Sequence, residues 1–261
     1  MTPGTGPGAG IQLRDARVRY GPLEALHGAT LTAPAHALTV LLGPNGSGRT
    51  TALRALAGTV RLTAGSVVWD GVDVTRHTAH ARAAAGLRFV PDRQAVFAGL
   101  TVAENLRLAA TKAAPKAATK AANTAADKRD FGAALDAYPE LRPLLARRAG
   151  TLSGGEQRML AVSRALLAPA RVVLVDEPTQ GMAPPVATRT YALLRALDAC
   201  VVLAEQRLPP GLRGATSGAP DEATVFVHEL GRGAVVFRGE ATEIPPHRPD
   251  PISPPTSPAR E

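Results

Sequence analysis

The chain has 261 residues, 45% of them hydrophobic and 3% aromatic, with one cysteine and a formal net charge of +8. This length allows one large domain with a subdomain. So few aromatic residues argue against a platform on which single-stranded nucleic acid stacks, and one cysteine excludes a disulfide framework within the chain. The positive charge is compatible with an anionic ligand, although an Arg- and Ala-rich composition also explains it.

The hydrophobic periodicity predicts strands that alternate with helices. Strands are predicted by short apolar or alternating runs at residues 11–18, 29–31, 38–42, 65–69, 87–90, 172–175, 200–204, 225–227 and 234–237. Helices are predicted at residues 52–57, 102–110, 153–167 and 186–197, and residues 131–148 have a helical pattern that is broken at Pro139 and Pro143. This order indicates an α/β fold with a mostly parallel sheet, preceded by an antiparallel β subdomain and interrupted by a helical subdomain at about residues 92–150.

The composition of three segments predicts that they form no packed structure. Residues 1–10 are rich in Gly, Pro and Thr, and residues 241–261 are rich in Pro, so we expect disordered tails around a domain at residues 11–240. Residues 111–127 are a low-complexity run of Ala, Lys and Thr, interrupted by Pro115. We interpret this run as a mobile insertion; a basic contact with a membrane surface is the alternative.

No segment predicts a signal peptide or a membrane span. Residues 1–10 have neither a basic start nor an apolar core. The uncharged residues 28–48 are interrupted by Pro34, His36 and several glycines. We therefore expect a cytoplasmic protein that acts at a membrane only through a partner. Cys200, the single cysteine, and His228 both lie in strand patterns, and we expect both to be structural.

A glycine-rich loop between a strand and a helix predicts a phosphate site. Its sequence is Gly43-Pro44-Asn45-Gly46-Ser47-Gly48-Arg49-Thr50-Thr51. Consecutive backbone N–H groups of such a loop surround an anion, and the following helix N-terminus adds a partial positive charge. Thr50 stands where these loops bind Mg²⁺, whereas Arg49 stands where the pattern has Lys. A glycine-rich turn without a ligand is the alternative.

A second glycine-rich segment opens the helix predicted after residue 153. It reads Leu152-Ser153-Gly154-Gly155-Glu156-Gln157. Ser153 is a good helix N-cap, and Glu156 three residues later completes the pattern of a capping box. The Ser hydroxyl and glycine N–H groups at a helix N-terminus also suit a γ-phosphate. The segment is therefore either a second anion site or an ordinary helix cap.

An acidic pair follows the apolar strand at residues 172–175. A buried strand would carry Asp176 into the shell of a Mg²⁺ ion and place Glu177 where it can polarise an attacking water. An Asp-Glu pair at the end of a strand with no such role is the alternative. The presence of two phosphate-site motifs in the same chain favours the catalytic interpretation.

Together these motifs resemble ATP-binding-cassette proteins, and residues 152–157 match the signature of that family letter for letter. The resemblance covers residues 13–239. Residues 90–106, 138–141 and 204–206 are similar to the ATPase subunits of branched-chain amino acid importers. The resemblance implies a P-loop NTPase fold, ATP and Mg²⁺ as cofactors, and ATP hydrolysis that drives transport.

The resemblance also implies roles and partners. Tyr20 would stack on adenine, Asp92 would join Thr50 and Asp176 around Mg²⁺, and Glu177 would be the general base with Gln206 as the sensor of the γ-phosphate. Residues Ser153 to Gln157 would serve the nucleotide of a second ATPase subunit in a head-to-tail dimer. Such dimers bind transmembrane permease subunits at the inner face of the membrane.

Three hypotheses remain open at this stage. An active transport ATPase is the first, and the resemblance is strongest for it. A catalytically silent half of a heterodimer is the second, favoured by Arg49 and Gln206 and opposed by the intact Asp176-Glu177 pair. The third, a cassette protein that acts on nucleic acid or ribosomes, is weaker because such proteins usually carry two cassettes and this chain has one. We expect no nucleic-acid partner.

Overall fold

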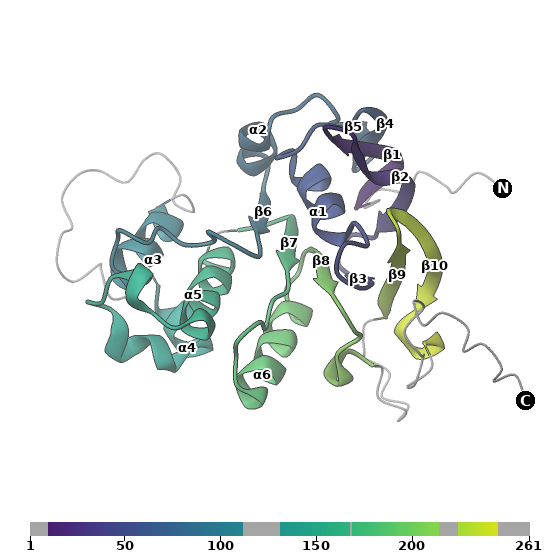
Figure 1. The fold of residues 1–261 in the computed structure, drawn as a ribbon. Helices are drawn as coiled ribbons and strands as arrows, with labels where there is room; N and C mark the ends of the chain where they lie inside the picture. Colours follow the sequence, from purple (N-terminus) through teal and green to yellow (C-terminus); the bar gives the residue numbers. More distant parts are fainter. Residues whose placement is uncertain (1–9, 112–130, 168, 214–223, 245–261) are drawn as a thin grey trace, which may run out of the picture.

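Two β-sheets organise the molecule, and the computed structural model describes residues 10–111, 131–167, 169–213 and 224–244 (Figure 1). The first sheet is antiparallel with the strand order β2-β1-β4-β5, and the second has the order β10-β9-β3-β8-β7-β6. The strands are β1 (Ile11–Tyr20), β2 (Leu23–Ala33), β3 (Leu38–Leu42), β4 (Ala64–Trp69), β5 (Val72–Asp73), β6 (Leu87–Val90), β7 (Val172–Asp176), β8 (Cys200–Glu205), β9 (Val225–Gly231) and β10 (Ala234–Glu240).

The helices cover the second sheet and form a separate lobe beside it (Figure 1). The α-helices are α1 (Arg49–Ala57), α2 (Ala79–Ala84), α3 (Val102–Thr111), α4 (Gly132–Ala137), α5 (Gly154–Leu166) and α6 (Pro184–Arg195). Short 3₁₀ turns occur at η1 (Pro139–Leu144), η2 (Ala149–Thr151), η3 (Pro210–Leu212) and η4 (Ala241–Glu243).

The second sheet is mostly parallel, as the alternation of strands and helices predicts. β3 pairs in parallel with β8 and β9, β7 pairs in parallel with β6 and β8, and β10 alone runs antiparallel to β9. In this register Leu42 lies opposite Glu205, and Asp176 lies opposite Ala204. The carboxyl ends of β3, β7 and β8 therefore meet at one edge, where the segments that follow them come together.

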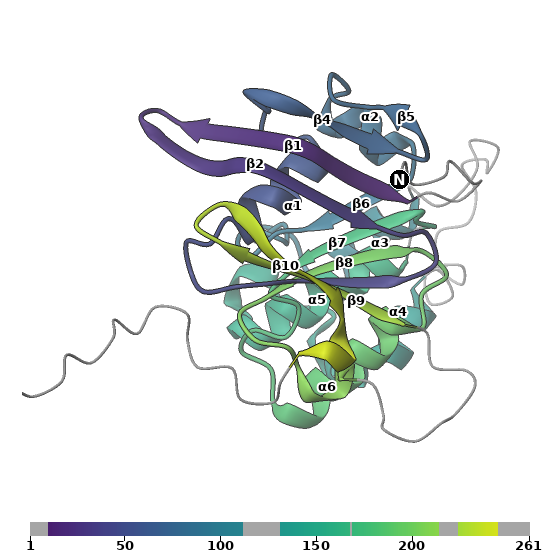
Figure 2. The ribbon, with the colours of Figure 1, turned by 90° about the vertical axis from the view of Figure 1, so that its right-hand side faces the viewer.

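Successive residues of the central strands enter two different cores, because side chains alternate between the faces of a strand. Leu41 and Leu174 pack with α1 and the antiparallel sheet. Val40, Val173 and Val175 pack on the opposite face with α5 and α6. Helix α1 lies between the two sheets, which Figure 2 shows from the side. These fully apolar strands are typical of a sheet covered on both faces.

The helical lobe is closed where it leaves and rejoins the sheet. Thr101 and Arg148 form an isolated antiparallel bridge, and the amide of Ala149 donates to the carbonyl of Leu100 at 2.8 Å. Within the helical pattern of residues 131–148, the predicted break at Pro139 is confirmed, because α4 ends at Ala137 and the 3₁₀ turn η1 begins at Pro139. Pro143 lies inside η1 rather than at a break. The prolines at 139 and 143 have no N–H to continue an α-helix.

Several predicted bounds differ from the structure. β2 has eleven residues rather than the three at 29–31, because it pairs with β1 along its whole length. Tyr20 is the last residue of β1 rather than a residue beyond it. The C-terminal tail does not begin at residue 241, since η4 follows β10 directly and Ala241 is buried in the core. α2 and β5 were not predicted.

The predicted insertion at residues 111–127 lies outside the described residues, apart from Thr111 at the end of α3. Cys200 is confirmed as a buried residue. His228 is buried in β9, where burial lowers its pKa, and its Nε2 lies 2.9 Å from the carbonyl of Thr32.

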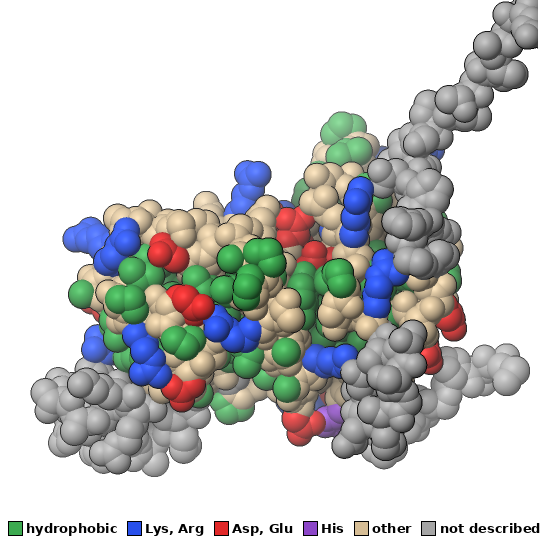
Figure 3. Space-filling model, turned by 90° about the horizontal axis from the view of Figure 1, so that it is seen from below, with side chains coloured by type: hydrophobic (Ala, Val, Ile, Leu, Met, Phe, Trp, Pro, Cys, Tyr) green, Lys and Arg blue, Asp and Glu red, His purple; other side chains and the backbone are tan. Residues whose placement is uncertain are grey.

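None of the helices in the described part of the chain is long and apolar enough to cross a membrane. On the face shown in Figure 3, hydrophobic side chains are interspersed with both basic and acidic ones.

Candidate functional site

The loop at residues 43–51 has the geometry of an anion cradle. Gly48, the residue before α1, has φ 104°, and a Cβ there would lie 2.9 Å from the carbonyl oxygen of Ala25. Only glycine fits both constraints. No side chain in the described residues caps the N-terminus of α1, so its first amides remain available to a ligand.

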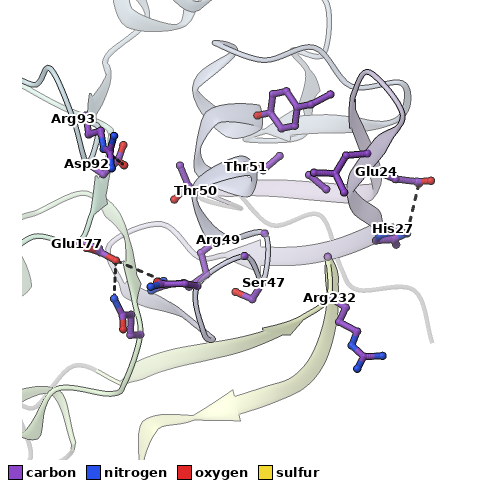
Figure 4. Close-up of a pocket in the computed structure, with 18 of the residues that line it drawn as sticks. Glu24, His27, Ser47, Arg49, Thr50, Thr51, Asp92, Arg93, Glu177 and Arg232 are labelled. Carbon is purple, nitrogen blue, oxygen red and sulfur yellow. Dashed lines mark hydrogen bonds and ion pairs between the residues drawn. The ribbon is translucent and has the colours of Figure 1, made fainter. Parts of the chain in front are cut away.

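A cavity of about 720 Å³ lies against this loop and collects most of the predicted site residues (Figure 4). The predicted residues that line it are Tyr20, Asn45, Gly46, Ser47, Gly48, Arg49, Thr50, Thr51, Asp92, Glu177 and Gln206. Gly43 and Pro44 belong to the loop but do not line the cavity, and Asp176 lies beneath it, 1% exposed. Tyr20 lines the cavity and is 42% exposed.

Asp176 and Thr50 form a small oxygen site under the loop. Burial raises the pKa of Asp176, and a hydrogen bond with the Thr50 hydroxyl opposes this effect. Its Oδ2 is buried and has no hydrogen-bond partner among the described residues. No group of three or more His, Cys, Asp or Glu side chains in that part of the chain forms a complete metal cage. One carboxylate and one hydroxyl, completed by phosphate and water oxygens, suit Mg²⁺.

Glu177 is held between two donors at the edge of the cavity (Figure 4). Its Oε1 accepts a hydrogen bond from Nε2 of Gln206 at 3.3 Å and lies 3.6 Å from Nη2 of Arg49. The same Nη2 donates to Oδ1 of Asn45 at 3.3 Å. Arg49 is 6% exposed, and its Nη1 has no hydrogen-bond partner among the described residues. The position that the loop pattern gives to lysine therefore carries a guanidinium that contacts the base through one nitrogen.

Asp92 lies across the cavity from the loop and is paired with arginines. Its Oδ1 is 3.5 Å from Nη2 of Arg54 on α1, and its Oδ2 is 3.9 Å from Nε of Arg93. The side chain lines the cavity together with Thr50. The position is compatible with the predicted place in a Mg²⁺ shell, which stays a prediction.

A buried carboxyl lies next to Gln206 and was not predicted. Burial raises the pKa of Glu205 to about 7, and the hydroxyl of Tyr191 opposes this by donating to Oε1 at 2.5 Å. The Tyr191 hydroxyl also contacts the hydroxyl of Thr179 at 2.9 Å. The pair therefore connects β8 with the segment that follows Glu177.

The residues of the family signature lie at the N-terminus of α5, outside the cavity. The predicted capping box is confirmed: the amide of Glu156 donates to Oγ of Ser153 at 3.3 Å, and the amide of Ser153 donates to Oε2 of Glu156 at 2.7 Å. Gly154 is exposed with open space around it. A Cβ on Gly155 would lie 2.4 Å from the carbonyl oxygen of Gly181, so α5 packs directly on that backbone.

Several residues of the site were missed because they come from distant parts of the chain. The turn between β9 and β10 lines the cavity, and the amide of Gly233 donates to the carbonyl of Ser47 at 2.9 Å. Arg158 is buried in α5 and donates to main-chain carbonyls beside the cavity. One signal was present: Arg158 lies on the stripe of α5 that also carries Ala161, Val162 and Ala165. A cation on an apolar stripe needs a specific partner.

Comparison with known proteins gives concordant matches. A family profile described as "ABC transporter" matches residues 26–180. The "Probable branched-chain amino acid transport ATP-binding protein LivF" of Archaeoglobus fulgidus is 36% identical over 232 residues, covering 87% of this chain and 91% of that protein. The "High-affinity branched-chain amino acid transport ATP-binding protein BraG" of Pseudomonas aeruginosa is 29% identical over 220 residues, covering 81% and 89%.

Solved structures share the fold. A dimeric ATP-binding cassette in a post-hydrolysis state, bound to ADP and Pi, superimposes with a TM-score of 0.73 at 20% identity, covering 90% of this chain and 100% of that one. An ATP-binding subunit of an ABC transporter superimposes with a TM-score of 0.70 at 19% identity, covering 88% and 89%. The predicted P-loop NTPase fold, with its antiparallel and helical parts, is confirmed by these matches.

Proposed function

The chain belongs to the ATP-binding-cassette transporter family, and from this premise we propose that it is the ATP-hydrolysing subunit of an importer for branched-chain or related amino acids. LivF and BraG, the two relatives that this chain matches over most of their length, are both named as branched-chain amino acid transport proteins. The observation that carries the proposal is the convergence of the phosphate loop, Glu177 and Gln206 on one cavity. The subunit acts at the inner face of a membrane, bound to permease subunits.

The chain binds ATP with residues that already line or underlie the cavity. The main-chain N–H groups of residues 43–51 hold the phosphates, and the ring of Tyr20 stacks on the base. Thr50 and Asp176, with Asp92 across the cavity, would hold a Mg²⁺ ion. When bound, this ion neutralises charge that develops on the phosphate oxygens.

Hydrolysis uses the acidic residue after β7. Glu177 accepts a proton from the attacking water at Oε1, the atom that now receives the hydrogen bond from Gln206. Gln206 keeps that carboxylate oriented and takes the position of the γ-phosphate sensor. The signature residues Ser153 to Gln157, of which Ser153 and Gly154 are exposed, serve the nucleotide bound by a second ATPase subunit, and closure of this dimer moves the permease.

A second candidate function follows from the contact between Arg49 and Glu177. The ion pair engages the base and withdraws the only cation of residues 43–51 from the phosphates. On this hypothesis the chain binds ATP but is the silent half of a heterodimer. The productive site then pairs the phosphate loop of the other subunit with the signature of this chain.

The test is ATP hydrolysis and uptake of leucine, isoleucine and valine by the transporter complex in vesicles. For an active subunit in a symmetric pair, Glu177→Gln and Ser153→Arg each abolish most hydrolysis and uptake. For a silent half, Ser153→Arg abolishes both, while Glu177→Gln costs far less. Ser153→Thr is the matched control, because its hydroxyl preserves the helix cap.

Other outcomes would contradict the proposal. If the complexes with Glu177→Gln and with Ser153→Arg both hydrolyse ATP at the wild-type rate, the transporter does not use this cassette. A complex that hydrolyses ATP without moving any of the three amino acids refutes the substrate class and leaves the ATPase assignment intact.

A further inference from the structure

Arg158 joins the signature helix to the catalytic edge of the sheet. It lies in α5 and is 5% exposed. Its Nε donates to the carbonyl of Glu177 at 2.9 Å, and its Nη1 donates to the carbonyl of Pro91 at 2.6 Å. Glu177 directly follows β7 and Pro91 directly follows β6. One side chain therefore binds the main chain at the carboxyl ends of two neighbouring strands.

The backbone that Arg158 holds is in an unusual conformation. Glu177 has φ 48°, in the left-handed region that residues with a side chain rarely occupy. Such a residue keeps this conformation only when its surroundings impose it. The amide of Glu177 donates to the carbonyl of Ala204 at 2.9 Å, and its own carbonyl accepts from Arg158. The main chain of the base is thus fixed on both sides.

The surroundings of Arg158 explain why a cation is tolerated there. Burial lowers its pKa, while the carboxylates of Asp176, Asp92, Glu177 and Glu205 favour the charged form, in that order. Its Nη2 is buried and has no hydrogen-bond partner among the described residues. A planar fork is needed to reach two carbonyls at once, and lysine, with one nitrogen, cannot replace it.

Helix α5 contacts the same segment at a second point, one turn earlier. Gly155, within the signature, packs against the carbonyl of Gly181, where a Cβ would approach to 2.4 Å. The first two turns of α5 therefore hold the chain at Glu177 and again at Gly181. Both contacts join the signature helix to the segment that begins at the base of the same chain.

We propose that Arg158 is a positioning residue for hydrolysis: it holds the main chain of Glu177 and Pro91 to α5, and it thereby links the signature, which serves one nucleotide, to the base that acts on the other. The link between helix and segment stands on the contacts alone. Its consequence for turnover rests on the proposed function. The two parts require separate measurements.

Hydrogen exchange measures the link without any need for hydrolysis. In the nucleotide-free full chain, Arg158→Lys is expected to raise exchange at residues 177–182 about tenfold, because amides there donate within the segment or to β8. Arg164→Lys is the matched control, since Arg164 lies on the same helix and donates to the carbonyl of Ala95 at 2.7 Å. Hydrogen exchange in peptides from β1 and β2 serves as the measure of global unfolding.

The exchange result decides the link. Unchanged exchange at residues 177–182 in Arg158→Lys, or an equal rise in Arg164→Lys, overturns it. If Arg158→Lys does not fold, Arg158→Gln, which is neutral and can donate to one carbonyl, replaces it with the same expected direction.

Turnover measures the consequence in the assembled transporter. Arg158→Lys is expected to lower kcat about tenfold with the KM for ATP unchanged within twofold, and to cause no further loss in a Glu177→Gln background. Additive losses in that background would show that Arg158 does not act through Glu177 and would overturn the positioning role. A wild-type complex that hydrolyses no ATP refutes the proposed function, and the exchange experiment then still decides the link.

Discussion

Replacing Glu205 by glutamine should stabilise the nucleotide-free protein at alkaline pH. Burial raises the pKa of Glu205 from its ordinary value of 4.5 to about 7, although hydrogen bonding to Tyr191 and the charges of Arg49 and Arg158 oppose the rise. Because the folded-state pKa lies above the unfolded one, the ionised form is disfavoured in the fold. Glutamine has no charge to bury, and its Oε1 still accepts from the Tyr191 hydroxyl.

The size and sign of the effect follow from linkage. A pKa that rises from 4.5 to about 7 corresponds to about 3 kcal/mol, at about 1.4 kcal/mol per pKa unit. The cost of the native carboxyl is absent below pH 4.5, grows between pH 4.5 and 7, and is complete above that range. Glu205→Gln should therefore raise the free energy of unfolding by up to about 3 kcal/mol at pH 8.

Urea unfolding of the full chain between pH 5 and 8 measures this difference, and thermal unfolding should show a rise of roughly 6–12 °C at pH 8. Glu104 is a control whose pKa is shifted in the opposite direction. Hydrogen bonds from the backbone amide of Thr101, and then from its hydroxyl, lower the pKa of Glu104. Glu104→Gln should destabilise the protein to the same extent from pH 5 to 8, and this effect should fade only below pH 4.5, the ordinary value of the carboxyl. The prediction is refuted if Glu205→Gln lowers the free energy of unfolding at pH 8, or if it changes that free energy by the same amount from pH 5 to 8. Either result would show that the neighbouring arginines fully compensate the buried carboxylate.

Further predictions concern the nucleotide site and the signature. Tyr20→Ala should weaken ATP binding by roughly 5- to 160-fold in titration calorimetry, since stacking on a base contributes about 1–3 kcal/mol. Tyr20→Phe should bind normally, and equal affinity of all three proteins would remove Tyr20 from the base site. Gly155→Ala should lower the free energy of unfolding by about 1–3 kcal/mol because its Cβ meets the backbone of Gly181. Gly154→Ala, in open space, should leave stability unchanged, and equal losses would contradict the packing argument. Arg49→Lys should raise ATP turnover of the complex about tenfold, because the base is released from its ion pair. A tenfold rise corresponds to an activation barrier lower by about 1.4 kcal/mol. Unchanged turnover would show that the arginine is a competent substitute for lysine.

The amino-acid sequence alone predicted those features of the site that are local. The glycine pattern of residues 43–51 requires a strand before it and a helix after it, and both were found. The capping box of Ser153 and Glu156 involves residues three apart, so the spacing alone predicted it. The alternation of apolar strand runs with helical patterns likewise predicted a mostly parallel sheet, because parallel strands need helical crossovers between them.

Only the tertiary structure decided which distant residues meet. The parallel register of β3, β7 and β8 brings Arg49, Glu177 and Gln206 into contact, and no pattern in the sequence states the order of those strands. The same holds for the burial of Glu205 and for the two carbonyls that Arg158 reaches from α5. Capping and loop conformation depend on neighbours within a few residues, whereas ion pairs and pKa shifts depend on what the packed chain places beside a charge. The direction of Arg49 toward the base, which most affects whether this site turns over ATP, belongs to the second kind.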